Sequence, residues 1–191
     1  MMRKYRQKMI RWTQAFALGI SLLALGACTT GSSSSVYYAA FSGNTEAVEA
    51  LISSGGDPNE FFTGGWTPLM IAAAEGHSQT VHTLIKAGAN VNHKNQLDRT
   101  ALMFATRYGF ESIVTELVEA GADVNIVDQE GNGALWGAVK EGHVSLVKML
   151  LQKGADPGTK DRSGKTLLDW AKEAGNGEIV EMLGQAIAEK K

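Results

Sequence analysis

Glycine recurs at a fixed interval of 33 residues, and this period constrains the fold more than any other feature of the chain. Three further columns keep the same step: one of alanine, one of valine and one of leucine. The four columns are Gly43, Gly76, Gly109, Gly142 and Gly175; Ala39, Ala72, Ala105, Ala138 and Ala171; Val48, Val81, Val114, Val147 and Val180; and Leu51, Leu84, Leu117, Leu150 and Leu183. A period between about 20 and 50 residues is typical of a solenoid, in which each unit buries its apolar face only against its neighbours. The sequence therefore predicts a stack of similar units that binds through one extended face.

Within one unit, the residue types predict two helices separated by a tight stop. Thr67 offers a side-chain acceptor for an N-cap and Pro68 suits the first helical position, so a helix should begin there. Gly76 predicts a left-handed C-terminal stop, and a second helix should run from about Ser78 to Gly88. Apolar residues at helical spacing supply the buried stripes: Leu69, Ala72 and Ala73 on the first helix, and Val81, Leu84 and Ile85 on the second. Each unit is thus a helix pair followed by a turn-rich loop.

These units resemble the ankyrin repeat. Residues 65–77 read Gly-Trp-Thr-Pro-Leu-Met-Ile-Ala-Ala-Ala-Glu-Gly-His and residues 88–92 read Gly-Ala-Asn-Val-Asn, close to the motif of that family. The resemblance covers residues 36–191 and implies an all-α repeat solenoid of about five stacked repeats, including degenerate N- and C-terminal caps. The expected repeats span 36–62, 64–96, 97–129, 130–162 and 163–191. Departures from the motif are the loss of the proline at Ala101, Ala134 and Leu167, and Gly133 in place of the capping threonine.

The resemblance also implies a binding surface on the concave side, formed by the hairpin tips and the exposed face of each first helix. Repeat register assigns seven partner-binding residues to it: Trp66, Arg99, Arg107, Tyr108, Lys140, Glu141 and Lys165. The first four fall on adjacent repeats, and Trp, Tyr and Arg are the residue types that most often carry interface energy. We expect these four to anchor a folded protein partner and the charged residues further along to orient it.

Other aromatic residues near this surface have two interpretations. Phe104, Trp136 and Trp170 lie on first helices, but their columns adjoin the repeat interface, which favours core packing over partner contact. Phe61 and Phe62 either cover the end of the first cap or extend the binding surface.

The two arginines also have an alternative interpretation. Arg99 and Arg107 either contact the partner or pair with neighbouring carboxylates such as Glu75 or Glu111. Such pairs at a solvated surface contribute little to stability.

The first 27 residues have the pattern of a secretory signal peptide. Five basic residues precede an apolar run, residues 15–27, that is too short for an ordinary transmembrane span. Leu25-Gly26-Ala27-Cys28 resembles the lipobox of bacterial lipoproteins, which implies lipid attachment to the Cys28 sulfur, cleavage before it and acylation of the new amino terminus. The alternatives are a plain secretory signal with an incidental cysteine, and an uncleaved anchor. Residues 28–35 are expected to form the lipidated cysteine and a flexible Ser-rich tether to the repeat domain.

The charge of the processed chain bears on its partners and its location. Removal of residues 1–27 leaves 13 basic and 20 acidic residues, a formal net charge of −7. This acidic balance offers no electrostatic footprint for nucleic acid and no polybasic patch for anionic lipid, so we expect no nucleic-acid partner and membrane attachment through the lipid anchor alone. The resemblance to bacterial lipoproteins implies their sorting rule for a cell with two membranes, in which an aspartate after the lipidated cysteine retains the protein at the inner membrane; Thr29 occupies that position here. The expected location is then the outer membrane, facing the periplasm.

The inventory of reactive residues argues against an enzyme. Cys28 is the only cysteine, and the four histidines, His77, His82, His93 and His143, show no paired-ligand spacing for a metal. No Gly-x-Ser-x-Gly elbow or phosphate-binding loop occurs. We expect no catalytic residues, no metal, no cofactor and no small-molecule substrate, and a monomeric chain.

The sequence therefore predicts a membrane-anchored protein-binding module of the bacterial cell envelope. Two uses remain open: a helper of an envelope enzyme, or an inhibitor or immunity protein against a toxin. The alternative is a structural tether in envelope organisation without a tight partner, in which anchoring supplies avidity instead of pairwise affinity.

Overall fold

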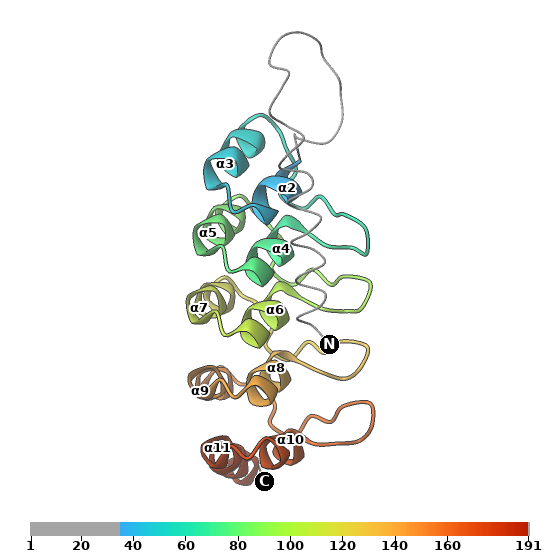
Figure 1. Cartoon of the computed structure of the whole chain (residues 1–191), viewed down its shortest axis with the longest axis vertical. Helices are drawn as coiled ribbons and strands as arrows, with labels where there is room; N and C mark the ends of the chain where they lie inside the picture. The colour runs from blue at the N-terminus through green and yellow to red at the C-terminus, as the bar shows by residue number, and fades with distance from the viewer. Residues whose placement is uncertain (1–34, 191) are drawn as a thin grey trace. The chain divides into compact units, whose positions relative to one another are not determined.

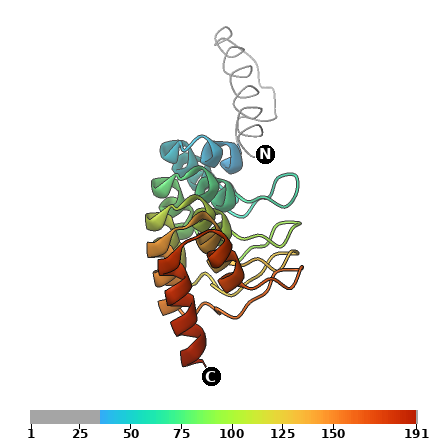
Figure 2. The same ribbon diagram turned by 60° about the horizontal axis from the view of Figure 1, so that its bottom comes forward.

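The computed structural model describes residues 35–190, which form five helix pairs stacked in sequence order (Figure 1). The first helices of the pairs form one column and the second helices form another, while the loops between pairs project on the side of the first helices (Figures 1 and 2). The pairs are α2 (Val36–Phe41) with α3 (Thr45–Ser53), α4 (Pro68–Glu75) with α5 (Ser78–Lys86), α6 (Ala101–Tyr108) with α7 (Glu111–Glu119), α8 (Ala134–Glu141) with α9 (Val144–Gln152), and α10 (Leu167–Glu173) with α11 (Gly177–Glu189). The predicted all-α repeat solenoid is confirmed. The expected signal peptide, Cys28 and nearly all of the tether lie outside the described residues.

Local sequence explains where the first helices begin and end. Thr67 Oγ1 accepts a hydrogen bond from the backbone N–H of Met70 at 3.3 Å, and Pro68 occupies the first turn of α4. Gly76 ends this helix in the left-handed conformation, with φ of 81°, as its position in the repeat predicts. Thr100 caps α6 in the same way, whereas Gly133 gives α8 no side-chain cap. Local sequence thus accounts for the ends of these helices.

The core runs between the two helix columns. Leu84, Leu117 and Leu150, one from each central second helix, are fully buried and lie 33 residues apart. In α4, every residue from Pro68 to Ala73 is buried, whereas the terminal helices α3 and α10 bury one and two residues, respectively. This difference is what capping repeats require, because one side of each has no neighbour to cover it.

A ladder of asparagine side chains joins consecutive repeats. Asn92 donates from Nδ2 to the carbonyl of Gly121 at 3.1 Å and accepts at Oδ1 from the backbone N–H of Asp123 at 2.8 Å. Asn59 and Asn125 make the same pair of bonds, each to the repeat that follows it. Gly158 occupies the fourth position of this column, so the ladder stops before the last repeat.

A second set of bonds joins the hairpin loops between helix pairs. The backbone N–H groups of Gln96, Gln129 and Arg162 each donate to a carbonyl of the preceding hairpin, at 2.8–3.2 Å. These bonds fix the position of each hairpin against its neighbours, and with it the residues that flank the first helices. No helix within residues 35–190 is both long enough and apolar enough to cross a bilayer.

Candidate functional site

The candidate site is the surface formed by the first helices α4, α6, α8 and α10 and by the hairpins that precede them, called here the inner face. All seven residues assigned from repeat register lie on these elements. Trp66, Arg99 and Lys165 close the hairpins, directly before the capping positions of α4, α6 and α10, and the other four lie in the last turns of α6 and α8. The hairpins project on the same side of the stack (Figure 2), so these residues share one extended surface.

Trp66 is half-buried and spans two repeats. Its ring stacks on that of Phe104 with the centroids 4.5 Å apart and the planes at 28°. Phe104 is only 9% exposed and belongs to the core, so its core-packing interpretation is confirmed. One face of Trp66 therefore serves the fold, and the remainder borders the inner face.

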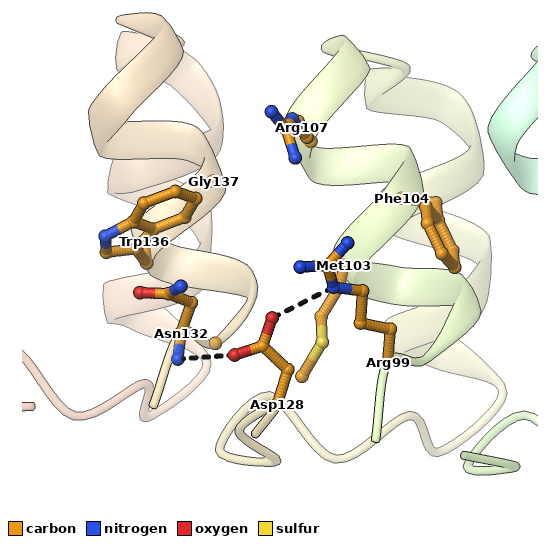
Figure 3. Close-up of a pocket in the computed structure, with 9 residues that line it drawn as sticks. Arg99, Met103, Phe104, Arg107, Asp128, Asn132, Trp136 and Gly137 are labelled. Atoms are coloured by element: carbon orange, nitrogen blue, oxygen red, sulfur yellow. Dashed lines mark hydrogen bonds and ion pairs between the residues drawn. The ribbon is translucent and has the colours of Figure 1, made fainter. Parts of the chain in front are cut away.

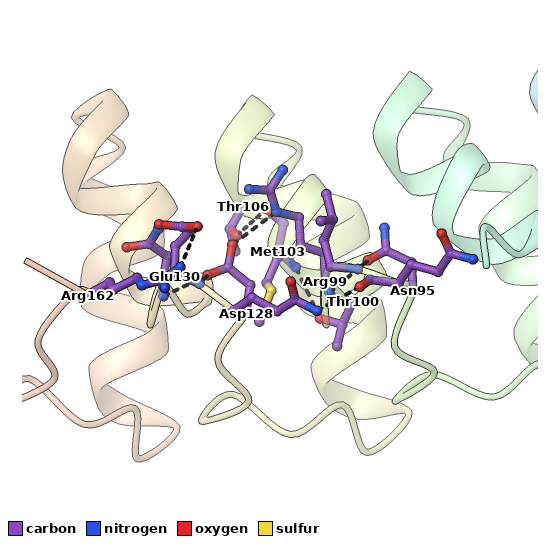
Figure 4. A network of polar contacts seen from close by, with 12 residues as sticks. Asn95, Arg99, Thr100, Met103, Thr106, Asp128, Glu130 and Arg162 are labelled. Atoms are coloured by element: carbon purple, nitrogen blue, oxygen red, sulfur yellow. Dashed lines mark hydrogen bonds and ion pairs between the residues drawn. The ribbon is translucent and has the colours of Figure 1, made fainter. Parts of the chain in front are cut away.

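Arg99 is held by the hairpin of the following repeat. Its Nε donates to Oδ2 of Asp128 at 3.0 Å, while Oδ1 of Asp128 accepts from the backbone N–H groups of Glu130 and Asn132, each at 2.9 Å (Figure 4). The Asp128 side chain is 5% exposed and that of Arg99 is 32% exposed, so the carboxylate is buried while the guanidinium still reaches the surface. Arg99 does pair with a carboxylate, but that carboxylate belongs to Asp128, so the prediction of Glu75 or Glu111 as its partner is wrong. The arginine reaches along the solenoid axis to the next hairpin instead.

Arg107 and Tyr108 lie at the end of α6. The nearest carboxylate to Arg107 is that of Glu141, at 3.8 Å from Nε, a loose contact at the surface and again not the expected partner. The Nε2–H of His143 donates to the backbone carbonyl of Arg107 at 3.2 Å and fixes the main chain there. Tyr108 is 48% exposed, the most open of the four expected anchor residues. A partner would meet the Tyr108 ring without any internal contact having to break.

Two lysines and two tryptophans form a cluster between α8 and α10 that the sequence did not predict. Trp136 and Trp170 meet edge to face with centroids 5.9 Å apart. Lys165 Nζ lies 3.4 Å from the centroid of Trp170 and also pairs with Glu173, and Lys140 Nζ lies 4.4 Å from Trp136 and 5.0 Å from Trp170. Both lysines are thus placed over aromatic faces, where a cation is attracted by the ring quadrupole.

Asp161, in the hairpin of the last repeat, has a pKa that the hydrogen bonds of its loop lower. The Ser163 hydroxyl, the indole N–H of Trp170 and the backbone N–H groups of Lys165 and Ser163 all donate to Asp161. These hydrogen bonds, that of the Ser163 hydroxyl foremost, lower the pKa of Asp161 from 3.8 to about 2. The carboxylate is ionised at neutral pH and holds the hairpin closed.

A small cavity lies between α6 and α8 on the inner face (Figure 3). Its volume is about 60 Å³, and both Arg99 and Arg107 line it together with Asp128, Asn132, Trp136 and Gly137. Asn132, Trp136 and Asp128 were not among the expected site residues. A signal was present in the repeat alignment, because Gly137 falls in the column of Ile71, Phe104 and Trp170 and leaves space that a side chain fills in the other repeats.

The aromatic residues before the first hairpin divide between the two expected roles. Phe62 stacks on Tyr37 with centroids 5.1 Å apart and meets Tyr38 edge to face at 5.5 Å, so it covers the first cap. Phe61 is 74% exposed and belongs to the hairpin surface.

Three of the histidines, His77, His82 and His143, make contacts that join one repeat to another. His77, two repeats before His143, makes the same kind of bond: its Nε2 donates to the carbonyl of Phe41, in the preceding repeat, at 3.1 Å. His82 Nδ1 lies 2.5 Å from Oε1 of Glu116 on the next second helix. Among residues 35–190, no group of three or more His, Cys, Asp and Glu side chains is placed to hold a metal ion.

Comparison with known families identifies this architecture. The model of the family described as ankyrin repeats (3 copies) matches residues 36–128 and, in a second overlapping match, residues 102–191. The two matches together span every helix pair of the structure. No curated protein matches the chain. The chain belongs to the ankyrin-repeat family, whose repeats generally act as protein–protein interaction modules.

Proposed function

We propose that this chain is a lipid-anchored protein-binding module of the bacterial cell envelope, and that its inner face binds a folded partner protein. The observation that carries the proposal is the patch of Trp66, Arg99, Arg107 and Tyr108 on two adjacent repeats of that face. These residue types dominate the energetics of protein interfaces, because they combine large contact area with directional hydrogen bonds.

Internal contacts prepare this patch for binding. Asp128 holds Arg99, and the bond from His143 fixes the backbone at Arg107. Association costs about 0.5–1.5 kcal/mol for each rotamer-rich side chain that it immobilises, and a side chain already held pays less of that cost. Each guanidinium has five N–H donors, so a held arginine still has donors for a partner. Tyr108, at the end of α6, then supplies exposed aromatic area.

The anchoring part of the proposal rests on the sequence. The lipobox at residues 25–28 provides Cys28 for acylation, and two or three acyl chains suffice for stable membrane attachment where one does not. The Ser-rich segment after Cys28 would hold the solenoid off the bilayer and leave the inner face free. The Thr29 position favours the periplasmic face of an outer membrane. A Cys28→Ser variant should leave the membrane fraction, and its retention there would exclude the lipid anchor.

Two uses of the module make different demands on affinity. An inhibitor or immunity protein must bind its toxin at nanomolar strength or better and block the active site. A helper of an envelope enzyme binds more weakly and leaves activity intact or raised. Once a partner is identified, its activity in the bound state distinguishes them.

The test is affinity capture by the tagged full chain from detergent-solubilised envelopes, with bound proteins identified by mass spectrometry. The variant Arg107→Ala/Tyr108→Ala should lose the partner; Trp66 stays intact because its stacking on Phe104 contributes to stability. Truncation of one dominant interface residue costs about 2 kcal/mol or more, about 30-fold in affinity. The matched control is Lys86→Ala/Lys148→Ala, which removes two long, exposed side chains from the second helices α5 and α9, outside the inner face.

Three outcomes are distinguishable. Loss of one partner in the patch variant alone supports the proposal. Equal loss in both variants means that the inner-face patch is not the binding site. Capture of no partner in either case favours the alternative, a structural tether that relies on avidity from its anchor.

A further inference from the structure

An exposed aromatic patch lies where α2, at one end of the stack, meets the hairpin that precedes α4 (Figure 1). It consists of Tyr37, Tyr38, Phe61 and Phe62 and is called here the cap patch. The Phe62 ring lies 5.1 Å from that of Tyr37 and 5.5 Å from that of Tyr38, centroid to centroid. Phe61 is 74% exposed, Phe62 45% and Tyr38 42%, so three of the six large hydrophobic side chains exposed within residues 35–190 gather here. Such patches mark contact sites for proteins or membranes.

Two hydrogen bonds fix the point at which the N-terminal segment joins the domain. Oε1 of Glu60, the residue before Phe61, accepts from the hydroxyl of Ser35 at 2.5 Å and from the backbone N–H of Tyr37 at 2.7 Å. Ser35 is the N-cap of α2 and the first described residue. The segment that carries Cys28 therefore enters the domain beside the cap patch, and a membrane that holds Cys28 also holds the patch nearby.

The length of the tether limits the distance between the cap patch and an anchor at Cys28. Residues 29–35 separate the cysteine from α2, and a fully extended chain of that length spans at most about 25 Å. A short linker of this kind gives the second contact a high effective concentration, so weak attraction is enough for association. The bilayer is thus the surface that the cap patch meets most often.

The chemistry of the cap patch fits the interface between lipid and water. Aromatic rings are enriched at that depth of a bilayer, because the ring lies against apolar chains while a tyrosine hydroxyl remains hydrated. Residues 35–76 contain no Lys, Arg or His, so attraction to anionic headgroups does not contribute at this end of the domain. The carboxylate of Glu60, beside the patch, already accepts two hydrogen bonds. Any attraction to lipid must therefore come from aromatic area.

We propose that the cap patch docks into the headgroup region of the bilayer that carries the anchor, and that Phe61, its most exposed side chain, enters the lipid. The anchor at Cys28 belongs to the proposed function, and the docking rests on it. Contact is confined to the first repeat and its hairpin, so the other repeats stay off the bilayer. Two points of attachment then give the inner face a fixed direction relative to the membrane.

The experiment places a fluorescent reporter in the cap patch of the acylated chain. Phe61→Trp keeps an aromatic ring at the most exposed position. The matched reporter is Val127→Trp, because Val127 holds the same hairpin position two repeats later and is 41% exposed. Both variants are purified from membranes, checked by mass spectrometry for acylation of Cys28, and reconstituted into phosphatidylcholine vesicles with or without bromine on the acyl chains. Bromine quenches an indole that contacts it within the lipid.

After subtraction of the wild-type signal, the Phe61→Trp emission should lie at shorter wavelength and lose intensity in brominated vesicles. The Val127→Trp emission should be the same in both kinds of vesicle. Adding Tyr38→Glu to the Phe61→Trp chain puts a charge into the patch and should remove the quenching. Adding Val127→Glu puts the same charge at an equally exposed side chain outside the patch and should leave the quenching unchanged. Raised salt should not weaken it, because the patch carries no cation.

Four results would overturn the inference. Absence of quenching in Phe61→Trp would mean that the tether alone holds the domain, and equal quenching of both reporters would mean that the solenoid lies along the bilayer. Loss of quenching at high salt would assign the contact to charge. Equal effects of Tyr38→Glu and Val127→Glu would show that the patch is not the contact. Should Tyr38→Glu unfold the first repeat, the comparison of the two reporters decides alone.

The docking and the proposed function fail separately. An acylated chain whose Phe61→Trp indole is not quenched keeps the proposed function and loses the docking. Quenching without a captured partner keeps the docking and removes the partner-binding role. A chain that carries no acyl group on Cys28 removes the anchor, and the docking with it.

Discussion

Two glycines of one repeat should respond in opposite directions to the same substitution. Gly137 lies inside α8, where its backbone is helical, and Gly142 ends that helix with φ of 78°. A Cβ atom at position 137 would lie 3.4–3.5 Å from Arg107 atoms, and one at position 142 would lie 3.6 Å from Asn176. Both distances are ordinary van der Waals contacts, so neither methyl group clashes. Backbone conformation is therefore the main difference between the two sites.

The expected magnitudes follow from this difference. Gly137→Ala removes the conformational cost of glycine in a helix, about 0.5–1 kcal/mol, and buries one methyl group, worth about 0.8 kcal/mol. Gly142→Ala forces an L-residue into the left-handed region at a cost of about 1–2 kcal/mol. For a domain of this size, 1 kcal/mol shifts Tm by about 2–4 °C.

Urea unfolding of the full chain, followed by far-UV circular dichroism, measures both changes. Gly137→Ala should raise the free energy of unfolding and Gly142→Ala should lower it. Shifts of the same sign in the two variants would refute the reasoning, because the backbone difference would then not decide the outcome.

Three further predictions concern the loops. Asn92→Ala removes two hydrogen bonds to the next repeat and should lower the free energy of unfolding by about 1–2 kcal/mol in urea; an unchanged midpoint would show that the ladder adds nothing to stability. Asp98 has φ of 60° where the equivalent residues of other hairpins are glycine, so Asp98→Gly should raise Tm, because relief of the left-handed strain outweighs the loss of an exposed ion pair with Lys94; a lower Tm would contradict it. The pKa of Asp161 is lowered to about 2, so its contribution to stability is present above about pH 4 and is lost as pH falls toward 2; acid titration of Asp161→Asn should show a shallower loss over that window than the wild type, and parallel curves would contradict it.

Most of the fold could be predicted from the 33-residue repeat and the residue types within one unit. Thr67, Pro68 and Gly76 act on the backbone through their own chemistry, and the expected start of α4 and the stop at its end are confirmed. The second helix begins at Ser78, as the sequence predicted. These signals are local, so one unit suffices to read them and the period extends them to the others.

Side-chain contacts on the inner face were predicted less well. Register gives the column and repeat of Arg99, but not the direction of a long, flexible side chain, and that arginine reaches Asp128 instead of Glu75 or Glu111. The cavity was not predicted for a related reason: it lies beside Gly137, which has no side chain where the equivalent residues of the other repeats have a large one. Whether such a space stays open depends on how Trp136 and Arg107 settle around it, which the pattern of one chain does not encode.

The asparagine ladder has a consequence for the order in which this array opens. Asn59, Asn92 and Asn125 join the first four repeats, and Gly158 leaves the last junction without this pair of side-chain bonds. The hairpin bond from Arg162, the contact of Lys190 with Asp156 at 2.9 Å and the Trp136–Trp170 contact still cross that junction. Local opening should therefore begin at α10 and α11, which amide hydrogen exchange would register as the earliest loss of protection. A protease acting on the folded chain would meet this C-terminal end first and would stop where the ladder begins. The resistant fragment would keep α6, α8 and the cavity between them.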